Sequence, residues 1–279
     1  EDRIIQGMVG RELTDRFRKR HNVKIGDVNM EVKNWTVHHP LYPERKVCDN
    51  VSIKVRKGEV VGISGLMGAG RTELAMSIFG QSYGTNISGQ LYLDGKEVHL
   101  KTIKQAIKNK LAYVTEDRKG NGLVLTNPIK INTTLANLDS ISPRMIIDKD
   151  KEYQVAEEYR GKLKTKCPTV EQNVGNLSGG NQQKVLLAKW MFTDPDVLIL
   201  DEPTRGIDVG AKYEIYCIIN DLVAAGKSVV MISSELPEVL GMSDRIYVMN
   251  EGKIAGELSA EEASQEKIMS IIVTSGKGA

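Results

Sequence analysis

Long apolar runs, cysteines and an excess of charge of one sign are all scarce in this chain of 279 residues. No apolar stretch approaches the roughly 18 residues that a membrane-spanning helix needs, and the charged start Glu1-Asp2-Arg3 is unlike a secretory signal. The cysteines Cys48, Cys167 and Cys217 lack metal-ligand spacing, which predicts reduced thiols. The net charge of +2 argues neither for nor against a nucleic-acid partner. These absences exclude a bilayer span and a disulfide scaffold.

What is present is the composition of a soluble globular protein, with 41% hydrophobic and 27% charged residues. The length suffices for one large α/β domain or two small ones. Reduced cysteines favour a cytoplasmic location. Because the sequence does not begin with methionine, we expect it to be a piece of a longer chain.

The stretch Gly65-Leu66-Met67-Gly68-Ala69-Gly70-Arg71-Thr72 has the spacing of a phosphate-binding loop, with Arg71 where lysine is usual. The apolar run at 59–64 predicts a buried parallel strand before it, and 72–79 predict a helix that stops at Gly80. The glycines allow a tight turn in which N–H groups converge, and the helix N-terminus adds positive charge. Phosphate is the favoured ligand. A chance match within an ordinary α/β protein is the simpler alternative.

Asp201 and Glu202 follow the apolar run at 197–200, which predicts a buried strand with both carboxylates at its C-terminal end. In a doubly wound sheet, the phosphate loop lies at the same edge. An aspartate there can hold Mg²⁺, and a second acid can polarise an attacking water. Alternatively, the pair only caps the turn at Pro203. The phosphate loop in the same chain favours the metal and base roles.

Ser178-Gly179-Gly180-Asn181 opens a predicted helix at 182–188. A serine and two glycines at a helix start form an anion site of the same type as the phosphate loop, with a hydroxyl donor added. In isolation, an ordinary helix N-cap is the simpler interpretation.

The rest of the chain alternates strands with helices, which predicts an α/β fold with a mostly parallel sheet. Exposed or edge strands are expected at 30–37 and 47–55, further strands at 111–114 and 228–232, and hairpins at 91–98 and 245–257. An apolar stripe predicts a helix ending near Gly226. The polar region 117–176, with helical patches at 133–138 and 150–164, predicts an inserted helical subdomain. The basic run at 16–21 is expected to be part of a solvated linker rather than a phosphate-binding segment, and the residues from Ser275 onward are expected to be disordered.

Taken together, Gly65–Thr72, Leu177–Asn181, Asp201-Glu202-Pro203-Thr204 and Gly206-Ile207-Asp208 resemble the ATP-binding-cassette (ABC) ATPases over residues 25–260. The particular residues within these motifs resemble, more narrowly, those of the second of two fused cassettes in monosaccharide importers of the ribose, galactose and multiple-sugar kind. Met8-Val9-Gly10-Arg11-Glu12-Leu13 resembles the linker before that second cassette. The resemblance implies a P-loop NTPase fold at 25–260 with an N-terminal antiparallel β subdomain and a helical subdomain at about 117–190. A linker at 1–24 and a tail at 261–279 would flank it.

The resemblance also implies roles at this chain's own site. Backbone groups of 65–72 would hold the β- and γ-phosphates of ATP. Thr72 and Asp201 would hold Mg²⁺, and Glu202 would act on the attacking water. Tyr42 would stack on adenine, with a plain loop tyrosine as the alternative.

A second set of roles lies at an interface with another cassette, because the family sandwiches two nucleotides between two head-to-tail domains. Ser178, Gly179 and Gly180 would contact the γ-phosphate of an ATP held by that other cassette. Asp208 would lie at the same interface.

Three positions depart from the family pattern. Arg71 replaces the lysine that reaches between the phosphates, and a planar guanidinium is bulkier than an ammonium. Glu116 stands where a glutamine usually touches Mg²⁺ and water; it could still ligate the metal but adds negative charge. Ser234 replaces a histidine that orients the γ-phosphate, which removes a transition-state contact. Glu202, the base, is retained.

We therefore expect an ATP- and Mg²⁺-dependent energy-coupling subunit of a sugar importer at the cytoplasmic face of the membrane. Its own site would hydrolyse ATP slowly. Its intact signature, Ser178-Gly179-Gly180, would serve a partner cassette. Other partners would be permease subunits, docked at 116–122 and the helical region after it, and indirectly a periplasmic or extracellular sugar-binding protein; no nucleic acid is expected.

Three alternatives remain open. The first is a nucleotide-clamped scaffold that never hydrolyses ATP. The second is a soluble ABC ATPase of DNA repair or translation, which would be expected to carry coiled-coil insertions or strongly basic faces. The third is a P-loop kinase, which would leave 177–181 without a purpose.

Overall fold

The computed structural model describes Phe17 and residues 24–276. The linker motif Met8–Leu13 and, apart from Phe17, the basic run at 16–21 lie outside the described residues.

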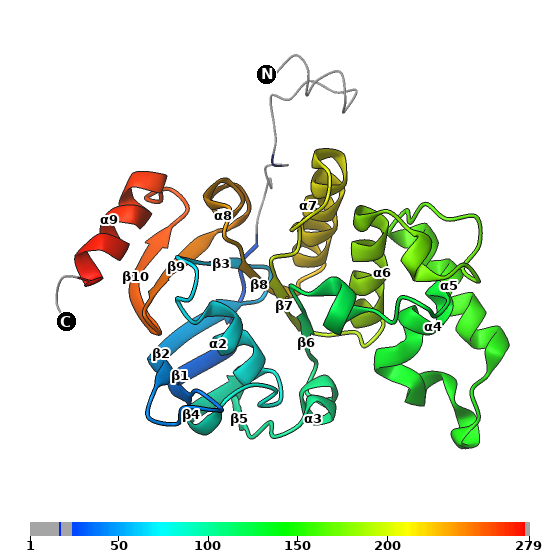
Figure 1. Ribbon diagram of the computed structural model, residues 1–279, viewed down its shortest axis with the longest axis horizontal. Coiled ribbons are helices and arrows are strands. Elements are labelled where there is room, and N and C mark those ends of the chain that lie inside the picture. The colour runs from blue at the N-terminus through cyan, green and yellow to red at the C-terminus, as the bar shows by residue number, and fades with distance from the viewer. Residues whose placement is uncertain (1–16, 18–23, 277–279) are drawn as a thin grey trace, which may run out of the picture.

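A six-stranded sheet runs through the middle of the molecule in the order β10-β9-β3-β8-β7-β6 (Figure 1). Its strands are β3 (Val60–Gly65), β6 (Leu111–Val114), β7 (Val197–Asp201), β8 (Ser228–Ile232), β9 (Arg245–Asn250) and β10 (Lys253–Ser259). All pairs from β9 to β6 are parallel, and β10 pairs antiparallel with β9. The expected mostly parallel sheet is confirmed, and β6, β7 and β8 are buried along their whole length.

A second sheet is antiparallel, in the order β2-β1-β4-β5. It contains β1 (Val28–His38), β2 (Lys46–Arg56), β4 (Thr85–Leu93) and β5 (Lys96–Val98). The prediction of an exposed or edge strand at 30–37 is wrong, because β1 pairs with β2 on one side and β4 on the other. Its alternating pattern reflects one face packed on the core and one face toward solvent. The predicted turn at Asp94-Gly95 is confirmed, and both residues have the positive φ of a tight hairpin.

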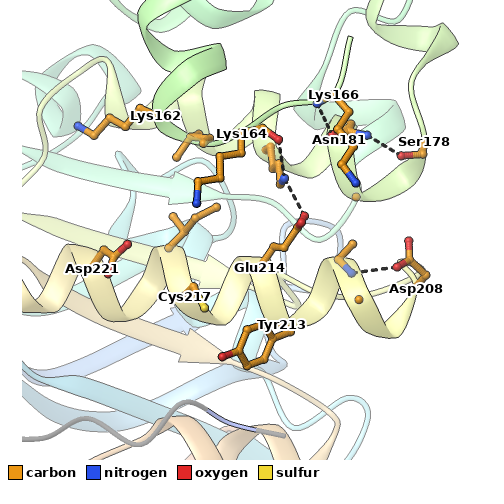
Figure 2. Close-up of a pocket in the computed structure, with 16 residues that line it drawn as sticks. Lys162, Lys164, Lys166, Ser178, Asn181, Asp208, Tyr213, Glu214, Cys217 and Asp221 are labelled. Atoms are coloured by element: carbon orange, nitrogen blue, oxygen red, sulfur yellow. Dashed lines mark hydrogen bonds and ion pairs between the residues drawn. The ribbon is translucent and has the colours of Figure 1, made fainter. Parts of the chain in front are cut away.

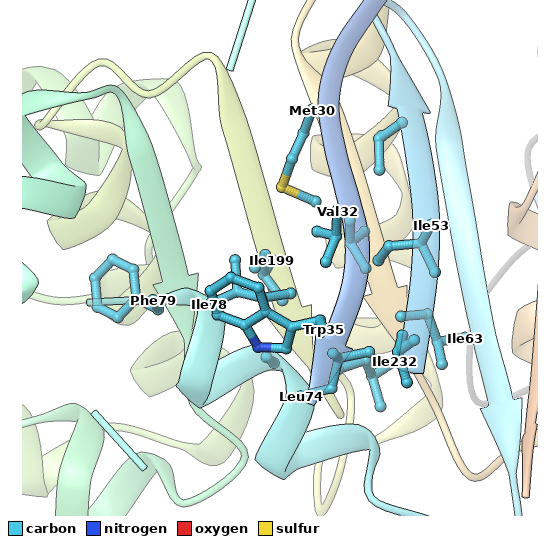
Figure 3. Packing of buried hydrophobic residues seen from close by; sticks show 14 of the residues in the cluster. Met30, Val32, Trp35, Ile53, Ile63, Leu74, Ile78, Phe79, Ile199 and Ile232 are labelled. Carbon is cyan, nitrogen blue, oxygen red and sulfur yellow. The ribbon is translucent and has the colours of Figure 1, made fainter. Parts of the chain in front are cut away.

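Helix α2 (Arg71–Ile78) packs against strands of both sheets. Its apolar residues Leu74 and Ile78 meet Trp35 from β1 in a shared core (Figure 3). The buried Trp35 Nε1 donates a hydrogen bond to Ser77 Oγ at 3.0 Å, and that hydroxyl donates to Leu74 O at 2.8 Å. The antiparallel sheet is therefore fixed to the helix that follows the phosphate loop.

Replacing Trp35 with Phe should lower the free energy of unfolding by about 1–3 kcal/mol. The change removes the indole donor to the buried Ser77 oxygen, whereas the bond from the Ser77 hydroxyl to Leu74 O and most of the apolar contact remain. Urea unfolding of the two proteins measures the difference. An unchanged midpoint would show that this hydrogen bond adds nothing to the attachment of the sheet.

The remaining helices cover the six-stranded sheet and form a helical region at one end of it (Figure 1). They are α3 (Ile103–Lys108), α4 (Ile129–Thr134), α5 (Lys149–Lys162), α6 (Gly179–Met191), α7 (Val209–Ala224), α8 (Leu236–Met242) and α9 (Gln265–Ser275). Short helical turns are η1 (Arg118–Gly122), η2 (Leu135–Ile141), η3 (Pro143–Met145) and η4 (Val174–Asn176). Both predicted helical patches in the polar region are present.

The C-terminal end is more ordered than the sequence indicated. Ser275 is the last residue of α9, so the prediction of disorder from that residue onward is wrong at Ser275 itself. Ile268 and Ile272, one helical turn apart, are buried against residues of α8 and β9. No helix within residues 24–276 is long and apolar enough to cross a membrane.

Candidate functional site

The phosphate loop connects the end of β3 to the start of α2, as predicted. Gly68 and Gly70 have φ of +78° and +95°, backbone angles that residues with a side chain rarely adopt. At Gly70 an added Cβ would also lie 2.4 Å from Val47 O, so no larger residue fits. No side chain caps the start of α2, and Met67 at the loop tip is 91% exposed. The N-terminus of α2 is thus open to a ligand from solvent.

Asp201 ends β7 and is completely buried. The Tyr113 hydroxyl, from β6, donates to Asp201 Oδ2 at 2.9 Å. Burial raises the pKa of the Asp201 carboxyl above its ordinary value, and hydrogen bonds from Thr72 and Tyr113 oppose that rise. Oδ1 is buried and has no hydrogen-bond partner among the described residues. A carboxylate oxygen in that state fits a cation ligand.

These residues fit Mg²⁺ only together with nucleotide. No group of three or more His, Cys, Asp or Glu in residues 24–276 is placed to hold a metal ion. Mg²⁺ is usually held by one or two carboxylates plus substrate phosphates and water. Asp201 Oδ1 and the Thr72 hydroxyl are the protein groups that would supply ligands here.

Glu202 lies at the start of the turn after β7 with φ of +47°, an unusual conformation for a residue other than glycine. The Ser234 hydroxyl donates to Glu202 Oε2 at 3.1 Å. Burial raises the pKa of the Glu202 carboxyl, and the bond from Ser234 and the charge of Arg71 oppose that rise. The structure therefore places the predicted base and Ser234 in direct contact.

Arg71 points toward this pair. Its Nη2 lies 3.9 Å from Glu202 Oε1, and its Nη1 donates to Ser233 O at 2.9 Å. The side chain is only 9% exposed. The cation that replaces the usual lysine is thus hydrogen-bonded to the loop after β8 and lies next to the proposed base.

Glu116 follows β6 and forms an ion pair with Arg205 in the turn after β7. Arg118 Nη1 also donates to Arg205 O at 3.3 Å. Arg205 was not singled out from the sequence, because nothing in its local pattern indicates a contact with a residue 89 positions earlier. A metal role for Glu116 would require this carboxylate to leave or share Arg205.

Tyr42 lies in the loop between β1 and β2 and is 57% exposed. Its ring centroid is 5.2 Å from that of His39, in a tilted arrangement. The exposed ring is accessible to a stacking partner, and an ordinary loop tyrosine would look the same.

Ser178 precedes α6 and does not cap it with its side chain. Instead, Asn181 Nδ2 donates to Ser178 Oγ at 2.9 Å, which leaves the hydroxyl proton for another acceptor. Gly180 lies against Ala211 of α7, where an added Cβ would come within 2.4 Å of the alanine Cβ. Asp208 caps α7 by accepting from Ala211 N at 2.9 Å. Ser178, Gly180 and Asp208 therefore form one group.

This group borders a cleft of about 560 Å³ (Figure 2). The cleft lies between α7 and residues 162–166, at the end of α5 and just after it. Lys162, Lys164 and Lys166 line one side, and acidic residues of α7 line the other. No hydrogen bond or ion pair within residues 24–276 joins the signature to this chain's own phosphate loop. The cleft is lined by Ser178, Gly180 and Asp208 and by no residue of 65–72.

Lys184 is a residue whose role was not predicted. It is buried in α6, with Nζ 2.7 Å from Glu214 Oε2 on α7, and it donates to Lys164 O at 2.9 Å. It therefore ties the signature helix to α7 and to the end of α5. The only signal in the sequence was its place on the predicted helix at 182–188, directly after Leu177–Asn181.

Lys189, five residues further along α6, donates from Nζ to Gly122 O, and burial lowers its pKa to about 8. Between pH 8 and pH 10 the unfolded chain holds this proton while the folded chain releases it. The native chain should therefore gain stability over Lys189→Met as pH rises, by at most about 1.4 kcal/mol per pH unit. Urea unfolding at several pH values measures this, and a constant difference would contradict a lowered pKa.

Comparisons with known proteins agree with this geometry. A family model described as "ABC transporter" matches residues 48–205. The chain is 61% identical over 272 residues to the L-arabinose transport ATP-binding protein AraG of Geobacillus stearothermophilus, covering 98% of this chain and 53% of that protein. It is 56% identical to the xylose import ATP-binding protein XylG of Thermoanaerobacter pseudethanolicus, covering 99% and 54%. It is 50% identical to the ribose import ATP-binding protein RbsA of Clostridium perfringens, covering 98% and 52%. The chain thus spans about half the length of these curated relatives.

Solved structures support the fold. A nucleotide-free ATP-binding cassette from an ABC transporter superposes with a TM-score of 0.72 at 21% identity, covering 90% of this chain and 97% of that one. A cassette in its ADP conformation gives 0.70 at 23% identity, covering 91% and 100%. With the family model matched over more than half of the chain, and with the loop, strand-end carboxylates and signature in place, the chain belongs to the ABC transporter family.

Proposed function

We propose that this chain is an ATP-hydrolysing, energy-coupling subunit of a monosaccharide importer. The observation that carries the proposal is the pairing of an open phosphate loop with a buried Asp201 that has an unpartnered oxygen and a neighbouring Glu202 held by Ser234. The relatives are named for the transport of L-arabinose, xylose and ribose. All three are small neutral sugars, so a monosaccharide is the proposed cargo.

At the chain's own site, backbone groups of 65–72 would bind the β- and γ-phosphates, and Tyr42 would stack on adenine. Thr72 and Asp201 would hold Mg²⁺, which supplies charge neutralisation at the phosphates. Glu202 would accept a proton from the attacking water; its raised pKa favours that role near neutral pH.

We propose that this site turns over slowly. Arg71 holds Ser233 O and lies beside Glu202 instead of being free to reach between phosphates. Its charge stabilises the ionised form of Glu202 and opposes proton acceptance. The same contacts favour the second candidate, a scaffold that clamps nucleotide and never hydrolyses it.

The signature would serve a different cassette. Ser178 keeps a free hydroxyl proton, and Gly179, Gly180 and Asp208 lie on the same surface, apart from this chain's own loop. A head-to-tail pairing would place an ATP of the other cassette against it. Since the chain matches about half of its relatives' length, we propose that the other cassette lies in the same polypeptide and that this one is the second.

The membrane partner would be a permease that docks at 116–122 and the helical region after it. A groove of about 840 Å³ lies between α3, η2 and the end of α6, and it is lined by Ile103, Leu138 and Trp190 among others. Lys189 lines this groove and binds Gly122 O, so the groove adjoins the proposed docking segment. The subunit would lie at the cytoplasmic face of the membrane, with a sugar-binding protein acting from the other face.

Reconstitution tests the proposal. The full-length protein that contains this chain, together with its permease subunits and sugar-binding protein, is placed in liposomes with ATP inside. Uptake of labelled arabinose, xylose and ribose is measured. ATP-dependent uptake of at least one of them is expected; none with any monosaccharide tested would contradict the assignment.

A further inference from the structure

Glu238 is a buried carboxylate, 2% exposed, in the first turn of α8. It has no part in the roles described above. Four side chains donate to its two oxygens, which is more than any of the proposed site carboxylates accepts. Thr204 Oγ1 and Tyr216 OH (2.6 Å) donate to Oε1, Lys212 Nζ lies 3.3 Å from the same atom, and Ser233 Oγ donates to Oε2 at 2.7 Å.

The donors come from three separate elements. Thr204 belongs to the turn after β7, which also carries Glu202. Ser233 lies between β8 and Ser234. Lys212 and Tyr216 are one turn apart on α7. A buried charge is stable only while such partners remain in place, so moving any one of these elements changes the energy of the carboxylate.

Ser233 connects Glu238 to this chain's own nucleotide site. Its hydroxyl donates to Glu238, while its carbonyl accepts from Arg71 of the phosphate loop. The next residue, Ser234, donates to Glu202. A nucleotide that attracts the Arg71 guanidinium would therefore release Ser233 O and alter the loop that Glu238 holds.

Helix α7 connects Glu238 to the signature. Its first turn carries Asp208 as cap and Ala211, which packs directly on Gly180. Lys212, the residue after Ala211, reaches Glu238. A shift of α7 would therefore displace Gly180, since no space separates Gly180 from Ala211.

We propose that Glu238 is a positioning residue that couples the state of this chain's own phosphate loop to the signature serving the other cassette. The proposal rests on the proposed function, because it requires the signature to act on a second nucleotide site. It gives the slow site a regulatory role: nucleotide there would set the position of α7 and with it the turnover of the other site. A coupling of this kind is typically worth about fivefold or more.

A double-mutant cycle in the full-length protein tests the coupling. Arg71→Ala removes the contact to Ser233 O, and Glu238→Gln removes the charge that its donors share. The readout is phosphate release by the other cassette, after subtraction of the release that remains when that cassette's site is blocked. We expect each single change to alter turnover about fivefold and the double change to have the effect of one.

A merely structural role gives a different result. Two independent defects would multiply, to about 25-fold when each is about fivefold, and that product would overturn the coupling. An Arg71→Ala protein with unchanged turnover of the other site would overturn it as well.

Glu152→Gln is the matched control. Glu152 is also a buried glutamate, 6% exposed, but it accepts from Thr134 in the helical region, far from the elements that surround Glu238. Any effect of Glu152→Gln on turnover by the other cassette should multiply with the effect of Arg71→Ala. If Glu238→Gln does not fold, Tyr216→Phe and Thr204→Val can replace it, because each removes one donor to Glu238. Combined with Arg71→Ala in the same cycle, each should again be non-additive.

Failure of the underlying function is recognised separately. If Gly180→Ala leaves turnover of the other cassette unchanged, the signature does not serve it, and the proposed function falls together with the coupling. If Gly180→Ala lowers turnover but the cycle is multiplicative, only the coupling is wrong.

Discussion

Changing Arg71→Lys, Glu116→Gln and Ser234→His together is expected to raise ATP hydrolysis at this chain's own site by about tenfold or more. The structure gives a reason at each position. Lysine carries a single ammonium nitrogen, so it cannot place two separate nitrogens toward Glu202 and Ser233 O as Arg71 does. Glutamine would release the ion pair with Arg205 and remove a negative charge beside the triphosphate. Histidine would restore a donor whose loss, in comparable electrostatic sites, costs about 3 kcal/mol.

The measurement is phosphate release by the full-length protein whose other cassette is blocked, so that only this site contributes. The triple variant with Glu202→Gln added is the control, because removal of the proposed base should abolish the gain. No gain in the triple variant, at saturating ATP and with unchanged folding, would contradict a slow site caused by these three residues.

Gly180→Ala in the full-length protein is expected to lower ATP turnover by the other cassette at least about tenfold. The added methyl group would lie 2.4 Å from the Ala211 Cβ, a distance that real side chains do not tolerate, so α6 and α7 must separate. Ser178 at the start of α6 and Asp208 at the start of α7 then lose their relative positions. Misplacement by about 1 Å is enough to cost orders of magnitude in rate.

Gly161→Ala is the matched control. Gly161 lies in the last turn of α5 with no atom near the position of an added Cβ, and alanine is favoured in a helix. Turnover should not change, and stability should be equal or slightly higher. Equal turnover in both glycine variants would show that the signature does not serve the other cassette.

The fold could be predicted from the sequence where a single pattern determines an element. Buried runs such as 197–200 and 228–232 became central strands, and Asp94-Gly95 became a hairpin turn. The position of β1 within its sheet could not be predicted. Alternation of apolar and polar residues indicates that one face of a strand is buried, but it does not indicate which strands pair with its two edges. Helix α9 was missed, because its apolar run at 268–273 is short and the partners that bury Ile268 and Ile272 come from α8 and β9, which a local pattern does not reveal.

At the site, too, local motifs could be predicted and contacts between distant segments could not. The order of motifs predicted the phosphate loop, the acidic pair and the signature, because each is a local stretch with its own backbone requirement. The contacts between stretches were beyond the sequence: Arg71 with Ser233 O, Glu116 with Arg205, and Glu238 with its donors. Apart from Ser233 with Glu238, such pairs join residues between 22 and 162 positions apart, and only packing decides which of them meet.

The most direct test of the account is titration calorimetry of this chain with ATP, with and without Mg²⁺, alongside ATP turnover under the same conditions. The account predicts Mg²⁺-dependent binding through Asp201 and Thr72, with negligible turnover. Substantial turnover by the chain alone would contradict the slow site and show that Arg71, Glu116 and Ser234 form a working variant. Absence of binding would contradict the phosphate loop as a nucleotide site.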